Sequence, residues 1–306
     1  KTFQEKLMNR FPLRLPLLLA AALLTACGAP RTAPLEERIE AVAAALDARV
    51  GVAILPPEGE PIVREDSLLP MLSVVKFPLA LAVLDRAARC GIPLSQPLDV
   101  GPEWLDADTY SPLRDSLPAE GGEVSLAGLL RYSTSLSDNI ACDRLMAFAG
   151  GPAAVEAYVR GLGIDGIRIA ATERMMHRDS AAVRANAARP SALCELFGRF
   201  LRGGLLPAEH EALLRRLLEG AATGADKLRA GIPPQVTLGH KTGSSDRTPE
   251  GIRTAENDAG YVLLPDGRLY CIAVLVVDSR EDDAANKAAI ARISEAAYEF
   301  FTQKKR

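Results

Sequence analysis

The chain has 306 residues, 48% of them hydrophobic and 25% charged, which is typical of a soluble globular protein of one large or two modest domains. Its net charge of -3, with no basic stripe, gives no electrostatic basis for binding nucleic acid. The sequence contains neither an internal repeat nor a low-complexity run.

Residues 1–27 have the pattern of an export signal. Positive residues precede an apolar run over 15–24, which is too short to span a bilayer. The run ends in Leu-Thr-Ala-Cys-Gly, which looks like a bacterial lipobox with Cys27 as the lipidated residue. The alternative is a plain secretory signal with a chance cysteine. Both interpretations predict export to the periplasm, and the first adds a membrane anchor at Cys27 only, followed by a linker over residues 28–34.

After the linker, the pattern predicts a helix over residues 35–49 and a hairpin from strands at 50–55 and 61–64. An apolar helix is then expected over 72–88. The polypeptide therefore enters its helical part through a short region of strand.

Ser73 is expected in the first turn of that helix. Free backbone N–H groups and the positive end of the helix dipole there favour an oxyanion. Lys76 follows three residues later, so both side chains share one face. A serine hydroxyl needs a neighbouring base to act as a nucleophile at neutral pH. Because S-x-x-K is a common pattern, other motifs must decide whether this pair is catalytic.

The middle of the chain is predicted to be helical, with two long loops. Residues 91–124 are rich in Pro, Gly and Asp and are expected to form a loop with short helical turns. Residues 168–189 are polar and aperiodic, and a structureless loop of this length is often functional. Helices are expected at 125–133, 140–148, 153–162, 190–202 and 207–219.

The C-terminal part returns to strands. These are expected at 236–243, 261–264 and 269–277, before a last helix at 284–302. Because strands occur at both ends of the mature chain, we predict an α+β fold: an antiparallel sheet domain from residues 35–66 and 220–306, with an all-helical domain (67–219) inserted and a cleft between them.

Four cysteines follow the signal segment: Cys90, Cys142, Cys194 and Cys271. None has C-x-x-C spacing, and Cys271 lies in an apolar strand-like run. We therefore expect free thiols, although an exported protein could pair them. No His/Cys ligand cluster is present in the sequence, so no metal or cofactor is implied.

Three motifs occur once each, in order: Ser73-x-x-Lys76, Ser137-Asp138-Asn139 and Lys241-Thr242-Gly243. Their predicted settings are a helix start, an inter-helix loop and a strand, which would face one another across the cleft. These motifs are those of class A β-lactamases and penicillin-binding proteins.

The residue types suit attack on a strained amide. Ser73 would attack the carbonyl, while Lys76 and a carboxylate would manage its proton. Ser137 would pass a proton to the leaving nitrogen. Asn139 can offer both an N–H and a C=O to an acylamide side chain.

The strand residues suit substrate binding. Lys241, with Thr242 and Ser244, would hold the substrate carboxylate. Gly243 would let the backbone approach closely. The backbone N–H groups of Ser73 and Ser244 would form the oxyanion hole.

Glu173, in the long loop, separates two classes of acylating enzyme. A transpeptidase deacylates slowly with water, whereas a hydrolase needs a second base to activate water on the acyl-enzyme. Glu173 stands where class A β-lactamases carry their catalytic glutamate, and the alternative is a solvated loop carboxylate.

The chain thus resembles the class A serine β-lactamases over essentially all of its mature length, most closely their PER/VEB/CfxA-like branch. Further matching stretches are 108–112, 137–143, 150–152 and 264–267. The resemblance implies the fold shared by β-lactamases and penicillin-binding transpeptidases. It also implies a monomer that hydrolyses β-lactam antibiotics, penicillins and cephalosporins among them, and thereby confers resistance.

The loop departs from the common family pattern. His177 and Asp143 stand where most relatives have asparagines, and Ala171 and Asn186 replace an Arg–Asp pair that fastens the loop. We expect a loop held in another way, with Asp143 and His177 interacting across it.

The residues expected to bind the substrate carboxylate also depart from the common family pattern. Residues 257–260 lack the strand arginine common in the family, so Lys227 or Arg229 would supply the charge. Tyr110 would form a wall of the cleft. Leu72 and Ser245 occupy the places of the cysteine pair of carbapenem-hydrolysing relatives, which argues against efficient carbapenem turnover.

Three alternatives stay open. A penicillin-binding DD-peptidase shares the three motifs but does not need Glu173. A β-lactam sensor acylates and stops. A serine esterase is disfavoured because the sequence has no G-x-S-x-G.

Overall fold

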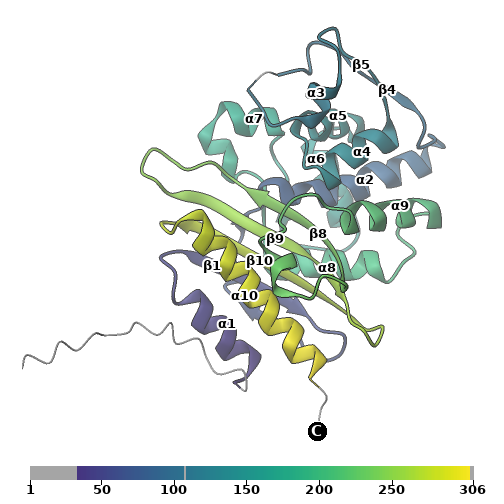
Figure 1. Cartoon of the computed structure of the whole chain (residues 1–306). Coiled ribbons are helices and arrows are strands. Elements are labelled where there is room, and N and C mark those ends of the chain that lie inside the picture. Colours follow the sequence, from purple (N-terminus) through teal and green to yellow (C-terminus); the bar gives the residue numbers. More distant parts are fainter. Residues whose placement is uncertain (1–32, 107, 304–306) are drawn as a thin grey trace, which may run out of the picture.

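A five-stranded antiparallel sheet forms the base of the structure, a computed structural model that describes residues 33–106 and 108–303. The strand order is β2-β1-β10-β9-β8. The strands are β1 (Arg49–Leu55), β2 (Ile62–Arg64), β8 (Thr237–Ser244), β9 (Arg253–Leu263) and β10 (Leu269–Ser279). Figure 1 shows the N-terminal and C-terminal strands side by side in this sheet, as the sequence predicts.

The two faces of the sheet belong to different hydrophobic cores. Val52 and its partner Val274 face α1 (Leu35–Ala43) and α10 (Asp283–Thr302). Their neighbours Ala53 and Ala273 face the helical part of the chain. Because side chains alternate along a strand, one strand supplies both cores, and alanines on the inner face let a helix lie close.

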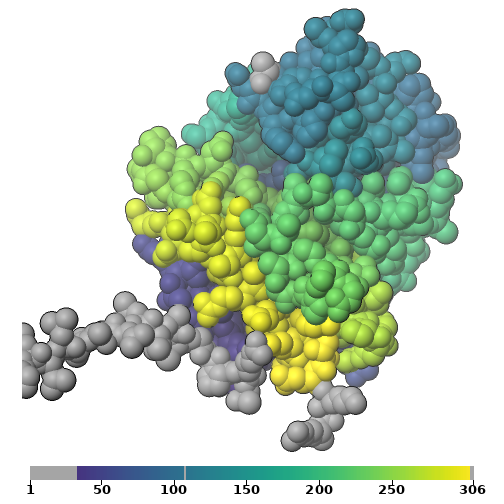
Figure 2. All heavy atoms as spheres, in the orientation of Figure 1, coloured from purple at the N-terminus to yellow at the C-terminus, as the bar shows by residue number. Residues whose placement is uncertain are grey.

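The helical part surrounds α2 (Lys76–Arg89), whose apolar residues are almost all buried. Phe77 of α2 stacks on Phe197 with ring centroids 3.8 Å apart. The surrounding helices are α4 (Leu126–Ser135), α5 (Asn139–Ala149), α6 (Pro152–Gly161), α8 (Pro190–Leu201) and α9 (Ala208–Glu219). Figure 2 shows the blue part of this helical region above the green and yellow part of the chain, to which both α9 and the sheet strands β8–β10 belong.

The two segments predicted as loops contain regular structure. Residues 91–124 include a hairpin of β4 (Pro97–Val100) and β5 (Gly122–Ser125), and α3 (Pro112–Ser116). The prediction missed the hairpin because its four-residue strands lie far apart in sequence and show no clear alternation. Residues 168–189 include α7 (Glu173–Arg178) and the 3-10 turn η2 (Ser180–Arg184), so the expectation of a structureless loop was wrong.

Short strands fasten this second loop at both ends. β7 (Ala187–Ala188) lies between β6 (Ile167–Arg168) and β3 (Leu69–Pro70) in a small antiparallel sheet. The loop therefore leaves and re-enters the fold at one place, beside the chain that leads into Ser73.

Several predicted boundaries need correction. Ser125 is the N-cap of α4 rather than its first residue, and that helix continues to Ser135 rather than ending at residue 133. α5 begins at Asn139 rather than Ile140 because Asp138 is its N-cap. β9 begins at Arg253, well before the predicted strand. Its first half is rich in polar residues, two of which, Arg253 and Glu256, line the cleft, and this hides the strand pattern in the sequence.

The four described cysteines are free, as predicted. Burial raises the pKa of Cys271 to about 12, and it raises the pKa of Cys142 and Cys194, so these thiols stay protonated. Cys27 lies outside the described residues. Within those residues, no helix is long and apolar enough to cross a membrane, and no group of acidic, His or Cys side chains could hold a metal ion.

Candidate active site

Ser73 lies in a 3-10 turn, η1 (Leu72–Val75), and α2 begins only at Lys76. The prediction placed Ser73 in the α-helix itself. With three residues per turn, side chains at i and i+3 eclipse one another, which brings this pair closer than an α-helix would. The fully buried Lys76 ammonium donates to Ser73 Oγ at 2.9 Å.

The Lys76 ammonium also joins three other parts of the site. It donates to the carbonyl of Ser137 at 2.8 Å and to Asn139 Oδ1 at 2.6 Å. It lies 3.0 Å from Glu173 Oε1. The Ser73 turn, the Ser137–Asn139 corner and Glu173 therefore meet at one cation.

Glu173 is the first residue of α7, and its Oε1 accepts from Ser73 Oγ at 3.5 Å. Thr172 caps the helix through the N–H of Met175. The carboxylate thus lies within direct reach of the Ser73 hydroxyl.

Asp143 and Asn186 hold the Glu173 loop. Asp143 Oδ1 accepts from the N–H of Glu173 at 2.7 Å, and its Oδ2 accepts from that of Arg174 at 2.8 Å. Among the described residues no hydrogen bond joins Asp143 to His177, so that expected interaction is absent and the backbone takes its place. Burial raises the pKa of Asp143 to about 6, and the negative charge of Glu173 adds to this rise.

Asn186 makes the second attachment. Its Oδ1 accepts from the N–H groups of Ala170 and Ala171 at 2.9 and 3.0 Å, and its Nδ2 donates to the Ala171 carbonyl at 2.9 Å. The loop is therefore held in another way than by an Arg–Asp pair, as the sequence predicts. A side-chain amide satisfies donor and acceptor together here.

Asp138 positions the Ser137–Asn139 corner. The buried carboxylate accepts from Ser111 Oγ, from the N–H of Leu113 and from the N–H of Ala141. It holds Ser137 in a left-handed conformation, with φ of 60°. Leu72, just before Ser73, also has positive φ, so strained backbone flanks the site on both sides.

The strand β8 forms the opposite wall. Lys241 Nζ donates to Ser137 Oγ at 2.9 Å, and Thr242 Oγ1 lies 2.7 Å from Thr223 Oγ1. Burial, followed by the positive charges of Lys76 and Lys227, lowers the pKa of Lys241 well below its usual range. An anion beside it would therefore stabilise its charged form.

Gly243 lets β8 pass close to the Ser73 turn. A Cβ there would lie 2.4 Å from the Met71 carbonyl oxygen and 3.1 Å from Ser73 N. The sequence reading assigned Gly243 to close approach of the substrate, whereas the structure shows close approach of the chain itself. This contact sets the spacing between the nucleophile and the backbone of β8.

A cleft of about 370 Å³ is lined by Ser73, Tyr110, Ser137 and the strand residues Thr242 to Ser244. A neighbouring hollow of about 610 Å³ is lined by Glu173, His177 and the β8–β9 turn. Tyr110 is 58% exposed at the rim. All the predicted site residues within the described chain thus lie in or directly behind these two hollows.

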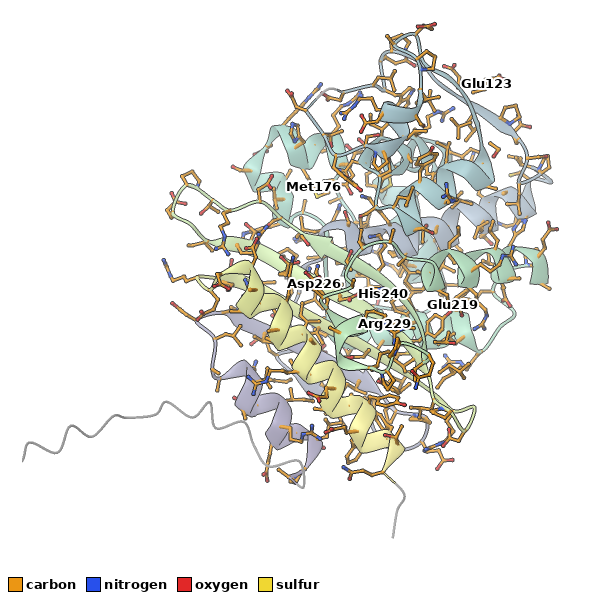
Figure 3. All side chains as sticks on the ribbon, in the orientation of Figure 1. Glu123, Met176, Glu219, Asp226, Arg229 and His240 are labelled. Atoms are coloured by element: carbon orange, nitrogen blue, oxygen red, sulfur yellow. The ribbon has the colours of Figure 1, made fainter. Side chains whose placement is uncertain are left out.

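Only one of the two proposed cations lies in the cleft. Lys227 lines it, and its Nζ donates to Ser244 Oγ at 3.0 Å. Arg229 instead donates to the carbonyls of Val236 and Pro233. Asp226, next to Lys227 in the sequence, lines the cleft, whereas Arg229 does not. Figure 3 labels both residues, with Arg229 below Asp226. Arg229 is therefore excluded as a substrate contact.

The comparisons with known proteins agree with this geometry. The model of the β-lactamase enzyme family matches residues 34–301. The chain belongs to the β-lactamase enzyme family. A β-lactamase of Bacteroides uniformis is 39% identical over 92% of this chain and 96% of its own length. The extended-spectrum β-lactamase PER-1 of Pseudomonas aeruginosa is 34% identical over 88% of each chain.

Solved structures narrow the family to class A. The structure of a class A β-lactamase from Bacteroides cellulosilyticus matches with a TM-score of 0.84 and 41% identity, over 88% of this chain and 98% of that one. This class A β-lactamase therefore hydrolyses β-lactams through a serine acyl-enzyme, and the DD-peptidase and sensor alternatives are not favoured.

Proposed function

We propose that this β-lactamase acts on penicillins and cephalosporins with Ser73 as nucleophile and Glu173 as deacylating base. One observation carries the assignment: a single carboxylate lies 3.5 Å from Ser73 Oγ and 3.0 Å from Lys76 Nζ. A hydrolase needs a base that remains beside the ester after acylation, and Glu173 has that position.

Acylation begins with proton loss from Ser73 Oγ. Lys76 reaches that atom directly at 2.9 Å, and Glu173 reaches it directly or through a water. Glu173 can accept the proton as a carboxylate, whereas Lys76 can accept it only after its ammonium has passed a proton to Glu173, 3.0 Å away. The N–H groups of Ser73 and Ser244 are the proposed donors to the oxyanion.

Ser137 is the proposed proton donor to the leaving nitrogen. Its Oγ accepts from Lys241 Nζ, so its own proton is free to point into the cleft. Once that proton has left, the hydrogen bond from the Lys241 ammonium stabilises the negative charge that develops on Ser137 Oγ.

Substrate groups on either side of the lactam find separate partners. The charge of Lys241 and the hydroxyls of Thr242 and Thr223 are assigned to the carboxylate. Asn139 Nδ2 and the hollow beside His177 are assigned to the acylamide side chain, and Tyr110 to the rim. The volume of that hollow, about 610 Å³, suits the bulky side chains of cephalosporins.

The cellular setting is part of the same proposal. The residues before 28 support export to the periplasm by a signal peptide, with lipid attached at Cys27 and a monomeric enzyme beyond it. Metabolic labelling with radioactive palmitate tests the anchor: label should enter the wild type and be lost in Cys27→Ala, whereas equal labelling of both would refute it.

The catalytic assignment is tested by hydrolysis of a chromogenic cephalosporin by residues 28–306 and its Glu173→Gln variant. The wild type should turn over rapidly, while the variant should accumulate a covalent adduct on Ser73, visible by intact-protein mass spectrometry. Glu120→Gln, the same change at an exposed residue, is the control. Unchanged turnover in Glu173→Gln would remove Glu173 from the mechanism.

A further inference from the structure

Glu256 lies at the carboxylate end of the cleft, yet no step described above uses it. The residue is in β9 opposite Ser244 of β8 and is 1% exposed, although it lines the cleft. An acidic side chain in a pocket for an anionic substrate opposes binding by its charge. Its hydrogen bonds show what it does there.

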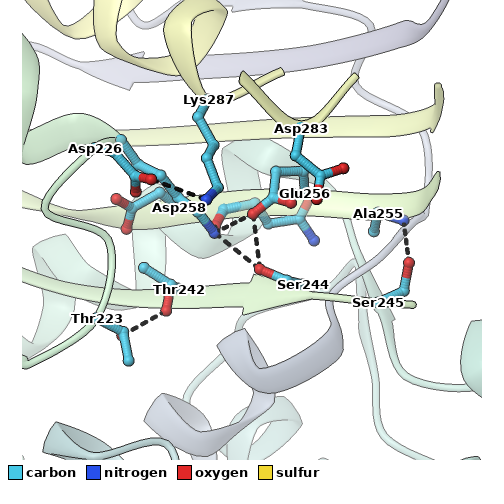
Figure 4. A network of polar contacts seen from close by, with 12 residues as sticks. Thr223, Asp226, Thr242, Ser244, Ser245, Ala255, Glu256, Asp258, Asp283 and Lys287 are labelled. Atoms are coloured by element: carbon cyan, nitrogen blue, oxygen red, sulfur yellow. Dashed lines mark hydrogen bonds and ion pairs between the residues drawn. The ribbon is translucent and has the colours of Figure 1, made fainter. Parts of the chain in front are cut away.

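Glu256 takes the donors that a substrate carboxylate would use. Its Oε1 accepts from Ser244 Oγ at 2.7 Å and pairs with Lys227 Nζ at 2.5 Å. Figure 4 shows Glu256 joined by dashed lines to Ser244 on the neighbouring strand. The carboxylate of Glu256 thus occupies the position of an internal anion.

Both donors are saturated by these contacts. A lysine ammonium has three N–H donors, and Lys227 directs them to Ser244 Oγ, the Asn257 carbonyl and Glu256. Ser244 has one hydroxyl proton and gives it to Glu256. With Glu256 ionised, neither residue has a proton left for a substrate.

Lys227 is also fixed from behind. Asp258 Oδ2 accepts from the N–H of Leu228 at 3.1 Å, which holds the chain beside Lys227 against β9. Lys287 pairs with Asp226 at 2.8 Å (Figure 4). Arg253 pairs with Asp283, and its Nε also lies 3.8 Å from Glu256 Oε2. Among the described residues lining this end of the cleft, each cation thus faces a carboxylate.

We propose that Glu256 is a specificity-determining residue that occupies the Lys227–Ser244 anion site and thereby weakens recognition of the substrate carboxylate. Recognition is left to the charge of Lys241 and to the Thr242–Thr223 hydroxyl pair, one of whose protons is free to point into the cleft. The inference rests on the proposed assignment of β8 to the substrate carboxylate.

The consequence concerns selectivity between charged and uncharged substrates. Neutralising Glu256 leaves the charge of Lys227 uncompensated, so that its ammonium favours a substrate carboxylate over the weaker amide acceptor of a glutamine. A free-acid β-lactam then gains a charge-assisted hydrogen bond that its ester cannot make. Glu256 therefore keeps the enzyme tolerant of β-lactams whose carboxylate is masked or displaced.

The experiment compares a chromogenic cephalosporin with its own methyl ester. In Glu256→Gln the ratio of kcat/KM for acid over ester should rise about tenfold above wild type, through a lower KM for the acid, since one such bond is worth about a factor of ten. Glu120→Gln should leave the ratio unchanged. An unchanged or lower ratio in folded Glu256→Gln would overturn the proposal.

A second variant keeps the test decisive if Glu256→Gln does not fold. Lys227→Met/Glu256→Gln removes both charges of the pair and leaves no unpaired ion. Because Lys227 is saturated in the wild type, the acid-over-ester ratio should stay near the wild-type value. A fall of about tenfold would show that Lys227 binds the substrate carboxylate directly, against the proposal.

Lys241→Ala in the same series separates this proposal from the one on which it rests. Loss of acid preference in that variant supports the assignment of β8 to the carboxylate. Retained preference would overturn that assignment itself, whatever Glu256 does.

Discussion

The two walls of the cleft are held by different kinds of interaction. The β8 wall belongs to a sheet, and eight consecutive residues, Thr237 to Ser244, pair with β9. The Glu173 wall is a loop between the short strands β6 and β7, which Asp143 attaches to α5 and Asn186 closes across its own base. The position of β8 is fixed by many backbone hydrogen bonds, so that no single side chain determines it. The position of the loop depends on the side chains of single residues. Deacylation should therefore be easier to damage than substrate binding.

The largest effect is expected at the one weak point of the strand wall, Gly243. In Gly243→Ala the new methyl group would meet the Met71 carbonyl at 2.4 Å, so β8 must move away from Ser73. A displacement of this kind should reduce kcat/KM about a hundredfold. Steady-state kinetics would measure this loss. Near-normal activity would contradict the prediction and would mean that the turn around Met71 moves to accommodate the methyl group.

The second-largest effect should distinguish the loop wall from the strand wall. Asn186→Ala removes the three side-chain hydrogen bonds to the backbone of Ala170 and Ala171 and leaves the buried N–H of Ala171 without its partner, at a cost of about 1–3 kcal/mol. Glu173 should then be misplaced, so that deacylation slows more than acylation. Burst kinetics with a chromogenic cephalosporin should show a fast first turnover and a slow steady state. Equal slowing of both phases would contradict the comparison.

Asp143 should make the loop wall sensitive to pH. Only the ionised carboxylate can accept from both Glu173 N and Arg174 N, so protonation below about pH 6 gives up one bond. Asp143→Asn makes that loss permanent. The ratio of wild-type to variant kcat should therefore rise severalfold between pH 5 and pH 7.5, and a constant ratio would contradict this.

Stability should change in the opposite direction at the same residue. Burial raises the pKa of Asp143 from 3.8 to about 6, so its contribution to stability is full below about pH 4 and is lost as pH rises through 6. The difference corresponds to about 3 kcal/mol. Thermal unfolding of wild type and Asp143→Asn should diverge accordingly, with the wild type relatively weaker at neutral pH.

The smallest effect is expected at Arg229. Its guanidinium binds backbone carbonyls away from the cleft, so Arg229→Ala should lower the unfolding temperature and leave KM unchanged within about twofold. A raised KM for the free-acid substrate alone would restore Arg229 as a carboxylate partner.

The sequence predicts the regular elements and the three motifs well because apolar periodicity and fixed spacing are local signals. It predicts that the loop lacks its usual attachment but not how Asn186 replaces it, since that contact depends on the folded path of the backbone. It leaves Lys227 and Arg229 open because they differ by two positions and by the direction of their side chains. It gives no sign of Glu256, whose role appears only when β9 lies beside β8.

The sheet that joins the two ends of the chain also determines when activity can arise during synthesis. Val52 of β1 pairs with Val274 of β10, so the first strand must wait for nearly the whole polypeptide before it finds its partner. Such distant pairing is slow, because a long loop must close before any contact rewards it. The nucleophile turn contacts β8, a strand of that same sheet. A nascent chain whose last strand has not yet been synthesised therefore contains Ser73, Lys76 and Glu173 but has no working site.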